Sequence, residues 1–193
     1  MFELPTYIEV DDKQFNIRNK GDYRVILDCF VALNDIELDE QLRVLTCMII
    51  FYQDLNSIDD IAELDKDTIL ELVDKMYFFL NCNEKSIGAT KPYRLIDWEK
   101  DTQLIASSIN KVANLEVRSL EYLHWWTFMG YYLNIGEGVL SNVVSIRDKI
   151  VRGKKLESYE KEFMHDNPHY FDWEWKTQEQ IEEEKLMREL WNG

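Results

Sequence analysis

The spacing of apolar residues changes after the first twenty positions of the chain, and it predicts two kinds of element. At the N-terminus, β-prone runs at residues 7–10 and 15–17 flank an acidic, turn-like segment at 11–13, which predicts a small β-hairpin. An isolated hairpin is only marginally stable in water. We therefore expect it to lie on the helices that follow or to pair with a neighbouring chain.

From Asp22 onward, apolar residues recur at three- and four-residue intervals, which lines one face of a helix. Asp39 is a candidate N-terminal cap for the second helix. Pro168 interrupts the helical pattern near the C-terminal end. The predicted helices begin near residues 22 and 39 and then cover about 69–77, 97–113, 119–135, 139 to a basic end near 152, and 156–163.

These elements predict a mainly α fold, a helical bundle of about six to eight helices with a small N-terminal β-hairpin. The helix expected at 119–135 carries apolar and aromatic residues around most of its circumference, so we expect it to be central. The expected divisions are a hairpin plus three-helix unit at 1–81, a linker at 82–96, an aromatic-rich helical unit at 97–165, and an acidic, aromatic tail with a terminal helix at 166–193.

Composition supports packed regular elements, because 46% of the 193 residues are hydrophobic and only 7 are Gly and 3 are Pro. The 22 basic and 37 acidic residues give a formal net charge of −15, which repels phosphate backbones and anionic headgroups. We therefore expect neither nucleic acid nor membrane as a partner. Cys29, Cys47 and Cys82 lack a paired spacing, and we expect reduced thiols in the helical core.

Motifs for catalysis or metal binding are weak. The segment 54–59 fits a calcium loop at two positions but lacks the required Gly, so we expect its acids to lie in a solvated loop and to cap the next helix. His165 and His169 are four residues apart, but a proline between them favours a polar loop over a metal site. His124 has no nucleophile at a revealing spacing, which favours a buried, hydrogen-bonded structural histidine. We predict no catalytic residue, cofactor or metal ligand.

Two groups of residues are candidates for binding a partner. The basic cluster either complements the end of its helix or meets an acidic patch on another copy of this acidic chain, which would allow self-association. The aromatic tail either folds back onto the second helical unit or docks on a partner. The candidate residues are Arg147, Lys149, Arg152, Lys154 and Lys155 in the cluster, and Trp173, Trp175, Met187, Leu190 and Trp191 in the tail.

Three runs of residues carry a resemblance to a known family. They are Arg94, Leu95, Ile96, Asp97, Trp98 and Asp101; then Leu123, His124, Trp125, Trp126, Thr127 and Phe128; then Ser145, Ile146, Arg147 and Lys149, with a Leu4-Pro5 start. The chain resembles the bacteriophage gene product fifteen family of tailed phages, most specifically in the tryptophan pair after Leu and His. We assign a structural role to Leu123, His124, Trp125, Trp126 and Phe128.

The resemblance implies a tail-region protein without an enzymatic motif, encoded near the tail tube and tape-measure genes. It implies a non-enzymatic tail assembly chaperone that binds the phage tape-measure protein and other tail proteins in the cytoplasm of the infected or lysogenic bacterial host. The alternatives are a structural tail component retained in the virion and an acidic DNA mimic that inhibits a host nuclease.

Overall fold

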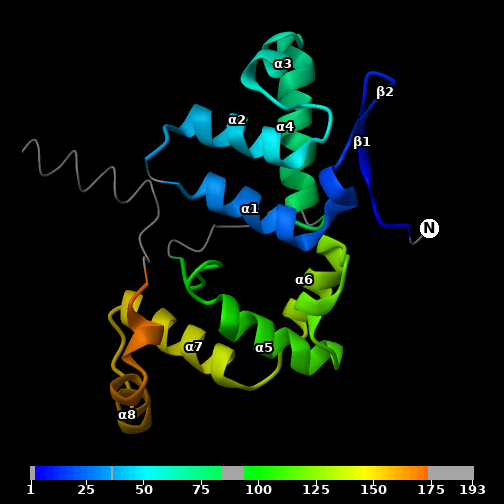
Figure 1. The fold of residues 1–193 in the computed structure, drawn as a ribbon. Helices are drawn as coiled ribbons and strands as arrows, with labels where there is room; N and C mark the ends of the chain where they lie inside the picture. Colours follow the sequence, from blue (N-terminus) through cyan, green and yellow to red (C-terminus); the bar gives the residue numbers. More distant parts are fainter. Residues whose placement is uncertain (1–2, 36, 84–93, 174–193) are drawn as a thin grey trace, which may run out of the picture. The chain divides into compact units, whose positions relative to one another are not determined.

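The computed structural model describes residues 3–35, 37–83 and 94–173 (Figure 1). In these ranges the fold has eight α-helices and one two-stranded sheet, which confirms the mainly α prediction and its N-terminal hairpin. The elements are β1 (Tyr7–Val10), β2 (Lys13–Asn16), α1 (Tyr23–Leu33), α2 (Glu40–Phe51), α3 (Ile58–Ala62), α4 (Lys66–Leu80), α5 (Thr102–Ala113), α6 (Trp125–Leu133), α7 (Val139–Val151) and α8 (Ser158–Asp166). Three short 3-10 helices, Arg18–Gly21, Val117–Ser119 and Pro168–Phe171, complete the set.

The chain forms two compact units that are interleaved in sequence. Unit 1 contains residues up to Ile87 together with Glu116–Leu133, and unit 2 contains Gly88–Leu115 together with the residues from Asn134 onward. This grouping departs from the expected chain-order divisions, because α6 packs with α1 in unit 1 although it follows α5 of unit 2 in sequence.

The β-hairpin of unit 1 lies on the helices. β1 and β2 pair antiparallel, and the two-residue turn between them, Asp11 and Asp12, has positive φ at both positions (49° and 61°), as a type I′ turn requires. Val10 and Phe15 are buried, and the Lys75 ammonium of α4 donates to the Glu9 carbonyl. The hairpin was expected either to lie on the helices or to pair with a neighbouring chain, and in the structure it packs on α4.

Helices α1, α2 and α4 build the core of unit 1 (Figure 1). α1 and α2 run side by side, and the side chains of Asp22 and Asp39 accept hydrogen bonds from the first-turn amides of Arg24 and Leu42. Such caps satisfy amides that have no partner within the helix. α2 turns Cys47, Met48 and Phe51 into the core, where all three are fully buried.

The segment after α2 is more ordered than the expected solvated loop. Ser57 and Asp60 form a reciprocal capping box that starts the short helix α3, which the apolar spacing did not predict. Asp54 accepts a hydrogen bond from the Asn16 amide at 2.5 Å, so it ties this segment to the end of β2. Asp60, just after the segment 54–59, takes part in a cap, and Asp54 within that segment links it to the hairpin.

Helix α6 is shorter than the predicted helix at 119–135, because it begins only at Trp125. The residues before it are extended: His124 bridges Asp22, the Leu123 carbonyl accepts from the Tyr23 amide at 2.9 Å, and the Leu123 amide donates to the Asp22 carboxylate at 2.9 Å. These contacts with the start of α1 replace the helical hydrogen bonds that the spacing predicted.

Two of the three cysteines occupy the predicted core position. Cys29 on α1 and Cys47 on α2 are fully buried, and contact with Cys47 together with burial raises the pKa of the Cys29 thiol. Cys82 differs, because it follows the end of α4 in a left-handed turn and is half-buried. All three are free thiols. No helix in the described ranges has the length and apolar run that a bilayer crossing needs.

Unit 2 is built on the packing of α5 against α7. Ile109 of α5 and Val143 and Ile146 of α7 are fully buried, at the three- and four-residue spacing of helix faces. α8 ends at Asp166, two residues before Pro168, which opens the last 3-10 helix as expected for a proline.

Candidate protein-interaction surfaces

Arg147 of the predicted basic cluster lies inside unit 2, with only 1% of its surface exposed. Its guanidinium forms a two-pronged ion pair with Asp101, with Nη1–Oδ2 at 2.6 Å and Nη2–Oδ1 at 2.9 Å. The same group donates to the carbonyl oxygens of Leu95 and Tyr170, each at 2.9 Å. A buried charge needs such partners, because its desolvation is costly. The charge of Arg147 is used within unit 2, so this member of the predicted partner-binding cluster is paired inside the unit.

Trp173 packs against this buried ion pair. The Arg147 guanidinium lies 4.7 Å from the centre of its ring, a cation–π distance, and the indole N–H donates to the Arg94 carbonyl at 2.8 Å. Trp173 is buried, so the first part of the aromatic tail folds back onto unit 2. Trp175, Met187, Leu190 and Trp191 lie outside the described residues.

The remaining residues of the basic cluster are only partly available. Lys149 pairs with Glu160 of α8 at 2.6 Å, and this contact raises the pKa of the lysine and lowers that of the glutamate. Arg152 pairs with Asp148 one turn earlier at 2.8 Å. Lys154 and Lys155 are exposed after the end of α7. Lys149, in the last turn of α7, has the position that favours a cation near a helix C-terminus.

Five of the residues that carry the family resemblance meet at the Arg147 ion pair. Asp101 accepts the Asp97 amide at 2.9 Å in addition to Arg147, while Arg94 and Leu95 supply carbonyl oxygens to Trp173 and Arg147. Asp101 and Arg147 are 46 residues apart in sequence, so local spacing offered no signal for their pairing. These residues have a structural explanation within unit 2.

The second group of resemblance residues forms a buried polar site in unit 1. His124 is 1% exposed; its Nε2 lies 3.0 Å from the Pro5 carbonyl oxygen, and its Nδ1 accepts from the Trp126 amide at 3.0 Å. These partners require a neutral ring with its proton on Nε2. Burial lowers the pKa of His124, which favours the same neutral form. His124 thereby joins the N-terminal segment to the start of α6.

The tryptophan pair that follows His124 caps the end of another helix. The Trp125 indole donates to the Leu80 carbonyl at 2.9 Å, and the Trp126 indole donates to the Phe79 carbonyl at 3.0 Å. Carbonyls in the last turn of a helix lack partners within it, so two consecutive indoles complete the C-terminus of α4. The Phe79 carbonyl also accepts from the Cys82 amide at 2.9 Å, so the Trp126 indole is a second donor there, while the Trp125 indole serves Leu80.

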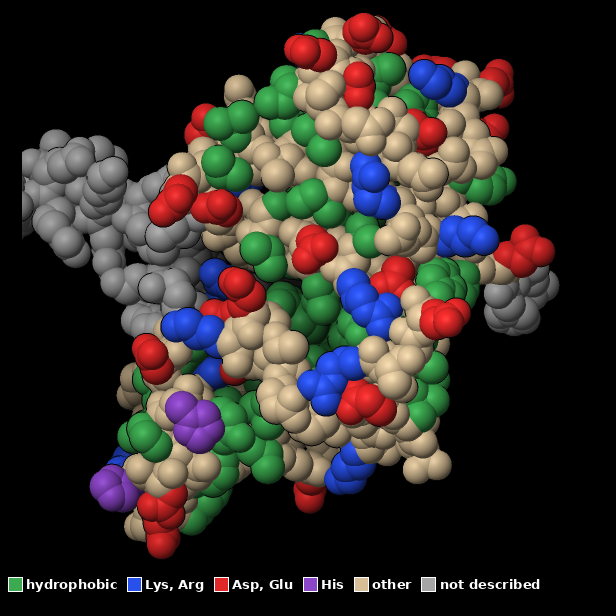
Figure 2. All heavy atoms as spheres, in the orientation of Figure 1, with side chains coloured by type: hydrophobic (Ala, Val, Ile, Leu, Met, Phe, Trp, Pro, Cys, Tyr) green, Lys and Arg blue, Asp and Glu red, His purple; other side chains and the backbone are tan. Residues whose placement is uncertain are grey.

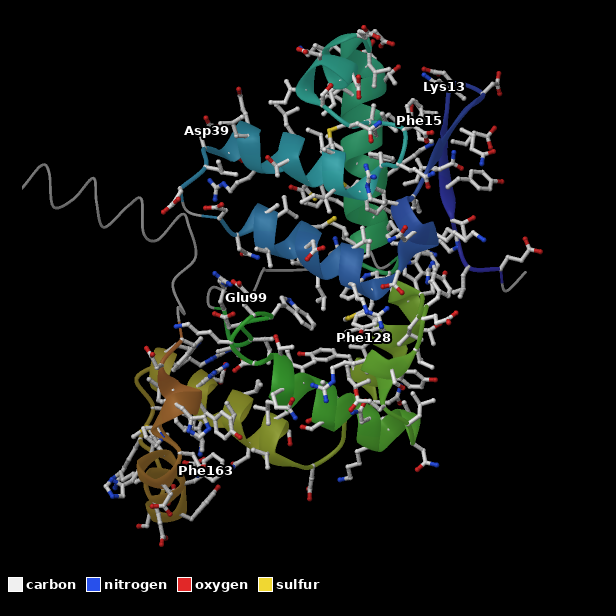
Figure 3. The ribbon with its side chains drawn as sticks, viewed as in Figure 1. Lys13, Phe15, Asp39, Glu99, Phe128 and Phe163 are labelled. Atoms are coloured by element: carbon white, nitrogen blue, oxygen red, sulfur yellow. The ribbon has the colours of Figure 1, made fainter. Side chains whose placement is uncertain are left out.

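Leu123 and Phe128 complete this arrangement around the start of α1. Phe128, labelled in Figure 3, stacks on Tyr23 with ring centres 4.5 Å apart and planes within 5°. Leu123 is buried and exchanges backbone hydrogen bonds with the Asp22–Tyr23 step. The run from Leu123 to Phe128 therefore holds together three earlier parts of unit 1: the segment at Pro5, the start of α1 and the end of α4.

Unit 2 also has a groove of about 660 Å³ between α5 and the residues before α7. Leu104 and Val112 supply apolar lining, Ser108 and Tyr170 polar lining, and the Lys111 ammonium donates to the Glu137 carbonyl at 3.4 Å. The volume is within the usual range of ligand pockets, but the Ser107 and Ser108 hydroxyls both donate to the Leu104 carbonyl and are thus already used inside unit 2.

Unit 1 presents apolar side chains outward on the pair α1 and α2. Between Arg43 and Tyr52, α2 has Thr46 as its only polar side chain, so the helix is apolar on its outer side as well as its core side. Figure 2 shows hydrophobic side chains over α1 and α2, with acidic ones among them. We name this surface the α1–α2 face; its apolar residues, exposed or half-buried, are Leu27, Val31, Leu38, Leu42, Leu45 and Ile49.

Charge is distributed unevenly between the two units. The described residues of unit 1 contain 8 Lys and Arg against 20 Asp and Glu, a net charge of −12, whereas those of unit 2 contain 9 against 10, a net charge of −1. The acidity that the composition showed for the whole chain therefore belongs mainly to the unit that carries the α1–α2 face.

In the described part of the chain, no three His, Cys, Asp or Glu side chains lie close enough together to bind one metal ion. His165 lies in the last turn of α8 and His169 in the following 3-10 helix, so the two belong to different elements. The calcium-loop segment at 54–59 is used for capping and for holding the hairpin, as described above.

Comparison with known proteins gives one match. The family model of the bacteriophage Gp15 protein matches residues 2–172, which include both buried polar sites and the α1–α2 face. No curated protein and no solved structure matches the chain. The match spans most of the 193 residues. The chain belongs to the bacteriophage Gp15 protein family.

Proposed function

We propose that this phage protein is a non-enzymatic tail assembly chaperone that binds the tape-measure protein. Membership of the Gp15 family supports a structural or assembly role in the phage. The observation that carries the finer proposal is the α1–α2 face, where Val31 is 44% exposed and Leu42 37% exposed on helices of an otherwise strongly acidic unit. Exposed apolar stripes on helices are suited to covering an apolar stripe of a partner helix.

The net negative charge of the protein also supports a chaperone role. A chaperone of an aggregation-prone helical protein has to keep the complex soluble, and a net charge far from zero opposes association between complexes. In this proposal the protein acts in the host cytoplasm, covers the tape-measure helices before the tail tube polymerises around them, and then leaves. The buried sites at His124 and Arg147 hold the fold in this scheme and carry out no chemistry.

Co-expression tests the proposal. The protein, carrying an affinity tag, is produced together with the tape-measure protein of the same phage, captured, and analysed by size-exclusion chromatography with light scattering. A soluble complex of fixed stoichiometry, together with absence of the protein from purified virions, is expected. Fixed copies in virions and no soluble complex would contradict the chaperone and favour a structural tail component.

A further inference from the structure

The α1–α2 face has a consistent helical spacing. On α2, Leu42, Leu45 and Ile49 recur at three- and four-residue intervals on the side opposite the buried Cys47 and Phe51. On α1, Leu27 and Val31 are one turn apart. α2 has 12 residues, which makes the helix roughly 18 Å long. The apolar strip from Leu42 to Ile49 covers roughly 10 Å of this length, which matches about two turns of a partner helix.

Acidic residues border this strip. Asp35, Glu37, Asp39 and Glu40 lie around the turn between α1 and α2, and Asp28 lies on α1 next to Leu27. In Figure 3, Asp39 marks this end of α2. Asp28 has no hydrogen bond or ion pair of its side chain within the described ranges, and partial burial raises its pKa above the usual value. A cation placed beside Asp28 would stabilise its charged form.

The cations near this face are already engaged. Arg24 pairs with Asp22 at 3.1 Å and donates to the Leu120 carbonyl at 2.7 Å. Arg43 is buried, and Arg18 donates to carbonyls at the C-terminal end of α2. The exposed charge bordering the apolar strip is therefore predominantly negative. This surface is matched by a partner that is both apolar and positively charged.

We infer that the α1–α2 face binds a cationic amphipathic helix, with the partner's apolar side chains on Leu42 and Val31 and its Lys or Arg side chains against Asp28 and the acids of the α1–α2 turn. The inference rests on the proposed function, since it names the kind of tape-measure segment that the chaperone would cover. An anionic helix would meet like charge, and an unstructured cation would leave the apolar strip uncovered.

Three synthetic 14-residue peptides test this inference against the full-length protein by fluorescence anisotropy. The first is an amphipathic Leu/Lys helix, the second replaces each Lys by Glu, and the third scrambles the first so that no apolar stripe remains. We expect the first to bind at least tenfold more tightly than the other two, and its affinity to fall as salt rises. Equal binding of the scrambled peptide would overturn the inference, because net charge alone would then explain the binding.

Matched variants locate the site. Asp28→Lys with Glu37→Lys should weaken binding of the Leu/Lys peptide about tenfold, at roughly threefold for each charge pair. Asp59→Lys on α3 with Glu63→Lys at its C-terminal cap makes the same change of net charge in unit 1 and should alter binding less than about twofold. Leu42→Ser should weaken it about tenfold, whereas Tyr159→Ser on α8 should not. Equal loss for both charge variants would place the binding elsewhere on unit 1.

The outcomes also separate this inference from the proposed function. If the tape-measure protein is captured but capture is insensitive to Leu42→Ser and to Asp28→Lys with Glu37→Lys, the chaperone stands and this face is not its site. If the Leu/Lys peptide binds as expected but the tape-measure protein is never captured, the face is supported and the chaperone fails. Circular dichroism of each variant checks that the helices are retained.

Discussion

Units 1 and 2 both fasten a later segment of chain to earlier backbone carbonyls, but with different chemistry. In unit 1 the donors are neutral: the His124 ring and the indoles of Trp125 and Trp126. In unit 2 the donor is the Arg147 guanidinium, held by the Asp101 carboxylate. The difference teaches that the strongly acidic unit uses neutral side chains to bind these earlier carbonyls, while the unit whose net charge is near zero uses a buried ion pair.

The two units should therefore differ in how much stability they lose when these side chains are replaced or when the pH is lowered. A neutral donor loses one hydrogen bond when it is replaced, whereas removal of one member of a buried ion pair leaves the other charge without a partner. A buried neutral histidine responds to mild acid, while an arginine stays charged throughout the accessible range.

Replacing Arg147 by Met should give the largest loss, about 3–5 kcal/mol of the free energy of unfolding, because Asp101 stays buried without its partner. Urea unfolding followed by tryptophan fluorescence measures it. Adding Asp101→Leu to Arg147→Met should restore part of the stability, since the unpaired charge is then removed. A single-variant loss below about 1 kcal/mol would mean that the ion pair is not the fastening of unit 2.

Replacing Trp125 by Phe should cost about 2–3 kcal/mol, because it leaves the Leu80 carbonyl without a donor and opens space in the core. Trp126→Phe is the matched control. It removes the neighbouring hydrogen bond at a half-buried position, so about 1 kcal/mol is expected. The urea midpoints of the two variants show which replacement costs more stability. Equal losses would contradict separate roles for the two indoles.

Mild acid should weaken unit 1 before unit 2. Burial lowers the pKa of His124 in the folded state, so its contribution is complete above the unfolded pKa of about 6.5 and is lost as pH falls toward the folded value. In unit 2, the hydrogen bond from Lys149 lowers the pKa of Glu160. The stability that this carboxylate contributes is therefore lost only as pH falls below about 4.5.

Fluorine NMR of the protein labelled with 5-fluorotryptophan can follow both units, because Trp125 lies in unit 1 and Trp173 in unit 2. Between pH 7 and pH 5, the urea midpoint reported by Trp125 should fall more than that reported by Trp173. His124→Asn should flatten the response of unit 1. If the His124→Asn variant keeps the same slope, other groups are responsible for the acid response.

The smallest effect is expected at the exposed pair Arg152–Asp148. Both side chains contact solvent, and ion pairs of this i, i+4 type contribute about 0.5 kcal/mol or less. Arg152→Ala should therefore leave the thermal midpoint nearly unchanged, in contrast to Arg147→Met five positions earlier. A large shift would show that the exposed part of the basic cluster supports unit 2 more than its contacts indicate.

Helix periodicity predicted the fold class because the apolar faces of α1, α2, α4, α5 and α7 follow regular three- and four-residue spacing. It placed the start of α6 too early. The apolar residues before Trp125 fit the spacing of a helix, but their backbone is extended and hydrogen-bonds to Asp22 instead. It missed α3, which is only five residues long and depends on a cap at Ser57.

The candidate surfaces could be predicted less well, for a physical reason. A cation in a sequence gives no sign of whether its partner lies far away in the chain, so Arg147 and Lys154 looked alike, yet one is buried and the other exposed. The outer side of α2 did have a signal, because a run of residues from Val44 to Phe51 with a single polar member cannot all face one core.

The interleaving of the two units determines when each can form during synthesis of the protein. α1 to α4 leave the ribosome well before Trp125 and Trp126, so the end of α4 receives its two indole donors only after α5 of the other unit has also been made. α5 in turn waits for α7 and Arg147. Until residue 133 has emerged, the nascent chain holds two unfinished cores in sequence, and no single cut of the chain separates one complete unit from the other.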